Sequence, residues 1–187
     1  VGSEMCIRDR AKTFNLDNPS LNVRFAGKRK FDEPDKIILS STGNLNIRHT
    51  LLKKNSIKSR TIIVTTQSGK QNLIKKIKKF PENVYIETFR LKQKKLPMQI
   101  VLERLSVHYN ISSILVEGGA DTYSAFLNSS LYDKIYLFYS PRFFGTGRKT
   151  RPFLSITSSE TASGKINHKI SKIMRCGPDI LMIIEKK

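Results

Sequence analysis

The 187-residue sequence has few cysteines, few acidic residues and no long apolar run. Its two cysteines, Cys6 and Cys176, lie near opposite ends and form no CxxC or Cys/His cluster. This arrangement argues against a zinc site and against a disulfide framework. No apolar run approaches the roughly 20 residues that a membrane-spanning helix needs. We therefore expect a globular protein of the reducing cytoplasm, with no metal and no membrane partner.

Basic residues outnumber acidic ones: the chain has 34 Lys and Arg and 15 Asp and Glu, for a formal net charge of +19. Such an excess is typical of proteins that bind nucleic acids. The basic residues, however, alternate with Ile, Leu and Asn and lack the interleaved aromatic side chains that stack on bases. We interpret most of them as solvated faces and disfavour nucleic acid as a partner. A basic nucleic-acid-binding module stays open as the alternative from a different functional class.

Apolar runs and amphipathic stripes alternate along the chain. Strands are expected over 36–40, 60–66, 84–88, 113–116 and 135–140, and helices over 72–80, 97–109 and 123–131. The 113–116 strand is expected to be buried. Two further runs, 166–175 and 180–184, flank a CGPD turn and indicate an antiparallel hairpin. The pattern predicts one α/β domain with a mostly parallel central sheet, flanking helices and a C-terminal antiparallel hairpin.

The first ten residues, VGSEMCIRDR, fit neither a secretory signal nor a strand, since their charges alternate and no apolar segment is present. They resemble a translated sequencing adapter or another non-native scar. We therefore exclude residues 1–10 from the predicted fold and assign residues 11–187 to the domain.

Polar residues follow three of the expected strands, at the ends where α/β sheets bind ligands. These tips are Ser40-Ser41-Thr42, Thr65-Thr66-Gln67 and Glu117-Gly118-Gly119. Two glycines before a helix allow a phosphate to approach the helix N-terminus closely. A tight turn with Asp121 or Thr122 as the N-cap explains the same residues equally well. Glu117 is either a solvated acid or an acceptor for donor groups such as sugar hydroxyls.

The three histidines, His49, His108 and His168, have no spacing that suggests a metal site or a catalytic triad. His108 continues the apolar stripe of the 97–109 helix, so we expect it to pack in the core. The sequence contains no G-x-S-x-G elbow and no zinc-deaminase signature, which leaves hydrolase and deaminase chemistry without support.

Three segments together resemble one known family. They are the segment 114–147, which begins ILVEGGADTYSAFL, the segment TFNLDNPSLNVR at 13–24, and the strand end IILSS at 37–41. In this order they resemble the RibD C-terminal reductases of riboflavin biosynthesis. The resemblance implies a dihydrofolate-reductase-like fold and NADPH-dependent reduction of 5-amino-6-(5-phosphoribosylamino)uracil to 5-amino-6-(5-phosphoribitylamino)uracil. A related NADPH-dependent reductase of another heterocycle is the alternative within the same superfamily.

The resemblance also implies roles for individual residues, although it identifies no catalytic proton donor. Substrate contacts are expected at Leu21, Arg24 and Glu117, with Arg24 suited to the ribose phosphate. Cofactor contacts are expected at Thr13, Asp17, Ser41, Gly119, Ala120, Asp121, Thr122, Tyr123, Ser124 and Ala125. The family further suggests a homodimer, and often a zinc-dependent deaminase domain upstream on the same chain.

One departure from the family pattern concerns the start of the domain. The family has a first strand and a segment resembling D-G-K upstream of Thr13, where this chain has VGSEMCIRDRAK. We therefore expect an N-terminally truncated domain that lacks an inner strand of its sheet. Such a sheet leaves backbone groups unpaired, so we expect impaired activity or poor folding.

Overall fold

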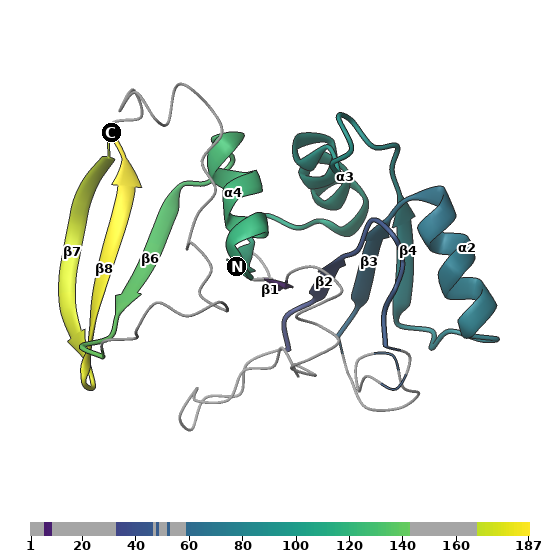
Figure 1. Cartoon of the computed structure of the whole chain (residues 1–187), viewed down its shortest axis with the longest axis horizontal. Helices are drawn as coiled ribbons and strands as arrows, with labels where there is room; N and C mark the ends of the chain where they lie inside the picture. Colours follow the sequence, from purple (N-terminus) through teal and green to yellow (C-terminus); the bar gives the residue numbers. More distant parts are fainter. Residues whose placement is uncertain (1–5, 9–32, 47, 49–51, 53–58, 143–167) are drawn as a thin grey trace. The chain divides into compact units, whose positions relative to one another are not determined.

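The computed structural model describes residues 6–8, 33–46, 48, 52, 59–142 and 168–187 (Figure 1). The chain divides into two compact units, Val1–Tyr123 and Ser124–Lys187, and each has its own β-sheet. Within the described residues, no helix is both long enough and apolar enough to cross a membrane.

The first unit contains a five-stranded sheet in which every described ladder is parallel. Its strands, in the order β4-β3-β2-β1-β5, are β1 (Cys6–Arg8), β2 (Lys36–Leu39), β3 (Thr61–Thr65), β4 (Val84–Thr88) and β5 (Leu115–Glu117). The two long apolar runs became β2 and β3, which are buried throughout, as strands covered on both faces are. The mostly parallel sheet of the prediction is confirmed.

The strand β1 lies inside this sheet and not at its edge. Cys6 pairs with Lys36 of β2 on one side and with Leu115 of β5 on the other. The predictions that residues 1–10 form no strand and that an inner strand is missing are therefore wrong. Ladder hydrogen bonds come from the backbone, so three extended residues suffice whatever their side chains. Since the inner strand is present, the reason for expecting poor folding or impaired activity no longer holds. A non-native origin of residues 1–10 stays a prediction.

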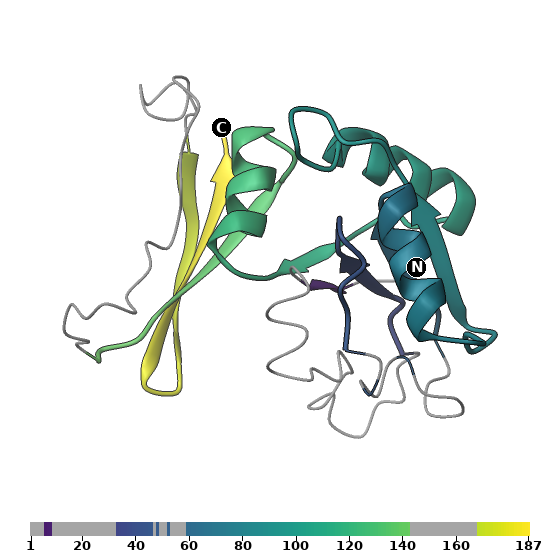
Figure 2. The same cartoon turned by 45° about the vertical axis from the view of Figure 1, so that its right-hand side comes forward.

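Two helices cover the faces of this sheet. In α2 (Gln67–Lys76), Leu73 packs with Ile38 and Ile63 in one core cluster. Side chains alternate between the faces of a strand, so Ile62 and Val64 point to the opposite face. There lies α3 (Met98–Tyr109), as Figure 2 shows, and it contributes Val101, Leu105 and Tyr109. The Tyr109 ring contacts Tyr85 of β4. The sheet between α2 and α3 is the core that holds the strand tips in place.

Two further elements of the first unit differ from their predicted form, and the helix expected over 123–131 begins three residues earlier, at Ala120. The helix expected over 72–80 begins five residues earlier, because Thr66 caps it by accepting a hydrogen bond from the backbone N–H of Gly69. The strand expected to be buried, now β5, is the last in the strand order, and Leu115 on it is 44% exposed. A terminal strand is covered on fewer sides, which explains the difference.

The second unit contains a three-stranded antiparallel sheet in the order β6-β8-β7. The chain reaches it through α4 (Ala120–Asn128), and its strands are β6 (Lys134–Tyr139), β7 (His168–Cys176) and β8 (Asp179–Lys186). A two-residue turn with Gly177 at φ +62° joins β7 to β8, which confirms the predicted hairpin. The phenol oxygen of Tyr132, two residues before β6, lies 2.6 Å from Nε2 of His168, the first residue of β7. This contact links the outer two strands at one end of the sheet.

Candidate functional site

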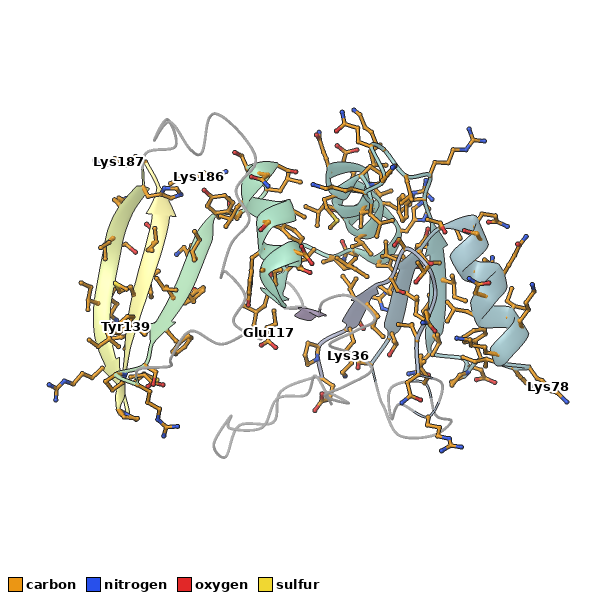
Figure 3. The ribbon with its side chains drawn as sticks, viewed as in Figure 1. Lys36, Lys78, Glu117, Tyr139, Lys186 and Lys187 are labelled. Atoms are coloured by element: carbon orange, nitrogen blue, oxygen red, sulfur yellow. The ribbon has the colours of Figure 1, made fainter. Side chains whose placement is uncertain are left out.

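The carboxyl ends of the five parallel strands form one edge of the first sheet. Glu117 is in register with Arg8, and Arg8 with Ile38. Gly119 and Ser40, each two residues further on, therefore leave the sheet at the same level. Two strand spacings, about 10 Å, separate them, with the end of β1 between. Two of the predicted strand tips thus meet at one edge, and Glu117 is exposed there (Figure 3).

The turn after β2 is held in one conformation by backbone hydrogen bonds. The N–H of Ser40 donates to the carbonyl of Val64 at 2.9 Å, and the N–H of Gly43 donates to the carbonyl of Ser40 at 3.1 Å. The Ser41 carbonyl accepts the hydroxyl of Thr66 at 2.7 Å. Ser41, a predicted cofactor contact, is therefore part of a well-defined turn beside the start of α2.

The start of α2 suits an anionic ligand. Its first turn contains no acidic residue, and two of its three lysines, Lys75 and Lys76, lie in the last turn. The side chains of Gln67 and Ser68 are exposed at the first turn. Helix N-termini attract anions through their partial positive charge. Ser41, Ser68 and this helix end supply the kind of hydroxyl and amide groups that the phosphates and sugars of a nicotinamide cofactor require.

Two hydroxyl groups beneath this helix end have no hydrogen-bond partner among the described residues. They are Ser40 Oγ and Thr65 Oγ1, on residues that are 4% and 0% exposed. They directly follow the paired residues Leu39 and Val64, on the α2 face of the sheet. Buried hydroxyls without partners are uncommon, and a ligand or water at the site is one explanation for them. They add polar character to the edge that already carries Ser41.

The Gly118-Gly119 turn leads directly into α4. The N–H groups of Thr122 and Tyr123 donate to the Gly119 carbonyl at 3.0 and 3.2 Å, and the N–H of Gly118 donates to the Tyr123 phenol oxygen at 3.2 Å. Gly119 therefore directly precedes the helix. The turn is as tight as the alternative predicted, but its choice of Asp121 or Thr122 as N-cap is wrong. The exposed Asp121 puts a negative charge in the first turn, which opposes a phosphate there.

The remaining predicted site residues fall into two groups. Along α4, Thr122 and Ser124 are buried, while Ala120, Tyr123 and Ala125 are half-buried. Their cofactor contacts stay predictions, as does the substrate role of Glu117. Thr13, Asp17, Leu21 and Arg24 lie outside the described residues.

The sequence interpretation placed Thr66 at one of the polar strand tips but missed that this residue caps α2. Its signal was a hydroxyl residue directly after a strand and directly before a possible helix, which is the usual N-cap pattern. Gly69 obscured the pattern, because a glycine directly after an apolar run usually indicates a turn.

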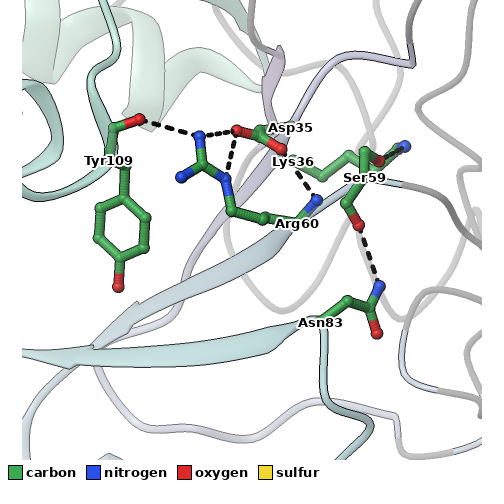
Figure 4. A network of polar contacts seen from close by, with 6 residues as sticks. All are labelled: Asp35, Lys36, Ser59, Arg60, Asn83 and Tyr109. Carbon is green, nitrogen blue, oxygen red and sulfur yellow. Dashed lines mark hydrogen bonds and ion pairs between the residues drawn. The ribbon is translucent and has the colours of Figure 1, made fainter.

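A separate polar cluster joins the amino ends of β2 and β3 to the end of α3 (Figure 4). Asp35 binds the guanidinium of Arg60, and this hydrogen bond raises the pKa of Arg60. The guanidinium also donates to the Tyr109 carbonyl at 2.8 Å. Asp35 and Arg60 precede their strands, so this cluster lies at the opposite edge from Ser41 and serves the scaffold.

On the face of the sheet that α3 covers, the carboxylate of Glu87 on β4 lies close to three polar side chains of α3. Tyr109 donates its hydroxyl to Oε1 at 2.9 Å, Arg104 lies 3.4 Å from Oε2, and His108 Nδ1 lies 3.7 Å from Oε1. The His108 side chain is 50% exposed, so its expected place in the core is wrong. Within the described part of the chain, no three His, Cys, Asp or Glu side chains come together as metal ligands would.

A sequence model of the family described as the RibD C-terminal domain matches residues 2–182. The chain belongs to this family. Among curated RibD relatives, a 5-amino-6-(5-phosphoribosylamino)uracil reductase of Buchnera aphidicola is 24% identical, over 97% of this chain and 86% of its own length. A 2,5-diamino-6-ribosylamino-4(3H)-pyrimidinone 5′-phosphate reductase of Aquifex aeolicus is 32% identical, over 72% of this chain and 55% of its own. The match covers only 34% of the riboflavin biosynthesis protein RibD of Chlamydia trachomatis.

Solved RibD structures share the fold. RibD of Acinetobacter baumannii superimposes with a TM-score of 0.75 at 20% identity, over all of this chain and 47% of its own. The riboflavin biosynthesis reductase of Saccharomyces cerevisiae gives 0.66 at 16% identity, over all of this chain and 75% of its own. The predicted dihydrofolate-reductase-like α/β fold of the RibD family is thereby confirmed.

Proposed function

We propose that this RibD-family chain is an NADPH-dependent reductase of riboflavin biosynthesis. Its substrate would be 5-amino-6-(5-phosphoribosylamino)uracil, as the name of the Buchnera relative suggests. The observation that carries the proposal is the family match over residues 2–182. The Ser41 and Gly118-Gly119 segments of this chain lie at the same edge of the sheet, the edge at which α/β folds bind ligands.

The proposed reaction reduces the opened sugar of the substrate. When bound, the cofactor supplies a hydride to C1 of the ribose at its imine linkage, and the imine nitrogen takes up a proton, so that C=N becomes CH–NH. The protein residues bind and orient the two molecules.

We assign the cofactor to Thr13, Asp17, Ser41 and the stretch from Gly119 to Ala125. The choice of NADPH over NADH is part of the proposal, and the helix end beside Ser41 is suited to an additional phosphate. Asp121 suggests that the start of α4 faces sugar hydroxyls or the nicotinamide amide instead of phosphate.

We assign the substrate to Leu21, Arg24 and Glu117. The exposed Glu117 carboxylate can accept hydrogen bonds from ribose hydroxyls. Arg24 would pair with the ribose phosphate through two parallel hydrogen bonds. Together these residues would select a phosphorylated sugar over a bare heterocycle.

A homodimer and a cytoplasmic location are also proposed. The Thermotoga maritima structure is named both a deaminase and a reductase. Partnership with a deaminase domain is therefore proposed for this reductase as well.

Binding and turnover together test the proposed function. The purified chain is first tested for NADPH binding by its thermal shift, with NADH as the comparison. Turnover is then followed as loss of reduced-nicotinamide absorbance with the phosphoribosylaminouracil substrate. The expected result is a shift with NADPH and turnover that Glu117→Gln and Arg24→Ala weaken through KM. No shift with either cofactor, together with salt-sensitive retention on RNA, would instead favour a nucleic-acid-binding module.

An unphosphorylated analogue separates the two reductase alternatives. For a phosphorylated substrate, Arg24→Ala should raise KM strongly, whereas it should leave KM for the analogue unchanged. NADPH binding with no turnover of the uracil substrate would point to a reductase of another heterocycle.

A further inference from the structure

The hydroxyl group of Thr66 connects the start of α2 to the Ser41 turn. It lies 2.7 Å from the Ser41 carbonyl oxygen, 3.0 Å from the backbone nitrogen of Gly69 and 2.9 Å from Ser68 Oγ. A carbonyl only accepts, so the single hydroxyl proton of Thr66 goes to Ser41. Ser68 is then the donor in the third contact. The proton and both lone pairs of Thr66 are thus engaged.

The backbones of the two segments touch beside this hydroxyl. A Cβ atom on Gly69 would lie 2.1 Å from Thr65 Oγ1 and 2.8 Å from the Ser41 carbonyl oxygen. A Cβ on Gly43, whose φ is +65°, would lie 2.0 Å from the Gly69 carbonyl oxygen. There is no space between the turn and the helix for any side chain. The Ser41 carbonyl is held against α2 by contact as well as by the hydrogen bond.

Other contacts between the turn and α2 lie at the surface. Asn72 Nδ2 donates to the Thr42 carbonyl at 3.0 Å, and Lys76 Nζ donates to Asn44 Oδ1 at 2.8 Å. Both are exposed, and water competes with such bonds. Thr66 is only 8% exposed, so its bond to Ser41 is the better protected one.

We propose that Thr66 is a positioning residue for the nicotinamide cofactor. Its hydroxyl holds the Ser41 turn in the conformation that binds the cofactor, and Thr66 acts through Ser41 without touching the cofactor itself. This inference rests on the proposed function, in which Ser41 is a cofactor contact. Without the hydroxyl, binding has to order the turn and is weakened accordingly.

Three variants test the inference, starting from Thr66→Val, which keeps the side-chain shape but removes the hydroxyl. The loss of one hydrogen bond should raise Kd and KM for NADPH about fivefold with kcat and the KM of the pyrimidine unchanged. Thr66→Ser restores the hydroxyl and should restore wild-type binding. Thr61→Val is the matched control, since it makes the same substitution at the first residue of β3, at the opposite end of the strand that Thr66 follows.

A second variant covers the case in which Thr66→Val fails to fold. Thr66→Asn keeps a good N-cap for α2. Its amide nitrogen lies one bond further from the backbone than the threonine hydroxyl and is not placed to make the same bond to the Ser41 carbonyl. This variant should therefore bind NADPH as weakly as Thr66→Val. Hydrogen exchange at the Gly43 and Leu45 amides gives a readout without cofactor. Both should exchange faster in Thr66→Val and Thr66→Asn than in Thr66→Ser.

The outcomes separate this inference from the proposed function. If the wild-type chain does not bind NADPH, the proposed function fails, and the exchange measurement still reports on the turn. If the wild type binds but Thr66→Val or Thr66→Asn binds equally well, the positioning role is overturned. Equal weakening in Thr66→Val and Thr66→Ser, or a loss confined to kcat, overturns it as well.

Discussion

The carboxylate of Asp35 holds Arg60 through both its backbone and its guanidinium. Oδ1 accepts the backbone N–H of Arg60 at 2.8 Å, and Oδ2 accepts Nε at 2.8 Å together with a second guanidinium nitrogen. The same guanidinium reaches the carbonyl of Tyr109, the last residue of α3. One ion pair therefore fastens β2, β3 and α3 at the edge opposite the candidate site.

Asp35→Asn should lower the free energy of unfolding by about 2 kcal/mol. Asparagine keeps the shape of the side chain but loses the charge and one of the acceptor positions that Arg60 uses. Chemical denaturation measures the effect, with Glu82→Gln as a control because that carboxylate is exposed in a turn. A change as small as that of the control, within about 0.5 kcal/mol, would show that the pair contributes little.

The strands and helices that the sequence predicted well are those specified by their own side chains. Runs rich in Ile and Val gave β2, β3 and β4 to within two residues, and the stripe through Val101 and Leu105 gave α3. The hairpin followed from its turn. In each case burial of apolar side chains decides the structure, and that pattern is visible in the sequence.

The features that were missed depend on backbone contacts between distant segments. The strand β1 forms because β2 and β5 offer ladder groups on both sides of Cys6–Arg8, which no pattern within VGSEMCIRDR reveals. Gly69 resembles a turn residue, yet it lies inside α2 because the Ser41 turn leaves no space for a side chain. Likewise, only the fold shows that Glu87 faces His108.

Thr61→Val should raise the free energy of unfolding by about 1 kcal/mol. Thr61 is fully buried, and its hydroxyl has no hydrogen-bond partner in the part of the chain that the structure describes. Valine keeps the β-branched shape and removes the cost of an unpaired buried hydroxyl. The denaturant midpoint measures the change, and a loss of stability would mean that the hydroxyl makes a bond in solution.

Tyr109→Phe should change how the free energy of unfolding depends on pH in the alkaline range. Burial raises the pKa of the Tyr109 phenol above its ordinary value of 10.0, and the hydrogen bond to Glu87 raises it further. Above pH 10 the unfolded chain therefore loses this proton before the folded chain does, so stability falls as pH rises. Phenylalanine removes this contribution but also the bond to Glu87, at a cost of about 2 kcal/mol at neutral pH.

The stability gap between wild type and Tyr109→Phe should consequently narrow as the pH rises above 10. Unfolding curves on both sides of this pH measure it. Tyr85→Phe is the comparison, because Tyr85 contacts the Tyr109 ring by its edge and is more exposed. A gap that is constant with pH would show that the phenol of Tyr109 titrates normally.

Glu185→Gln should remove part of the acid dependence of the antiparallel sheet. Glu185 lies in one cross-strand row with Lys134 and Lys169, at 3.1 and 3.7 Å from their ammonium groups. The hydrogen bond from Lys134 is the main cause that lowers the pKa of Glu185 below its ordinary 4.5. The unfolded chain then binds a proton first as pH falls. The stabilisation is complete above the ordinary glutamate pKa and is lost as pH falls through the lowered one.

An NMR titration of the Glu185 carboxyl measures this pKa directly, and thermal unfolding across the acid range measures its effect. The wild-type chain should lose more stability than Glu185→Gln below the ordinary glutamate pKa, while the two should differ by a constant amount above it. The row is exposed to solvent, so added salt should shrink the difference. Titration of Glu185 at its ordinary value would mean that the two lysines do not hold it in solution, and the β6–β8–β7 ladder would then depend on its apolar rows and backbone bonds alone.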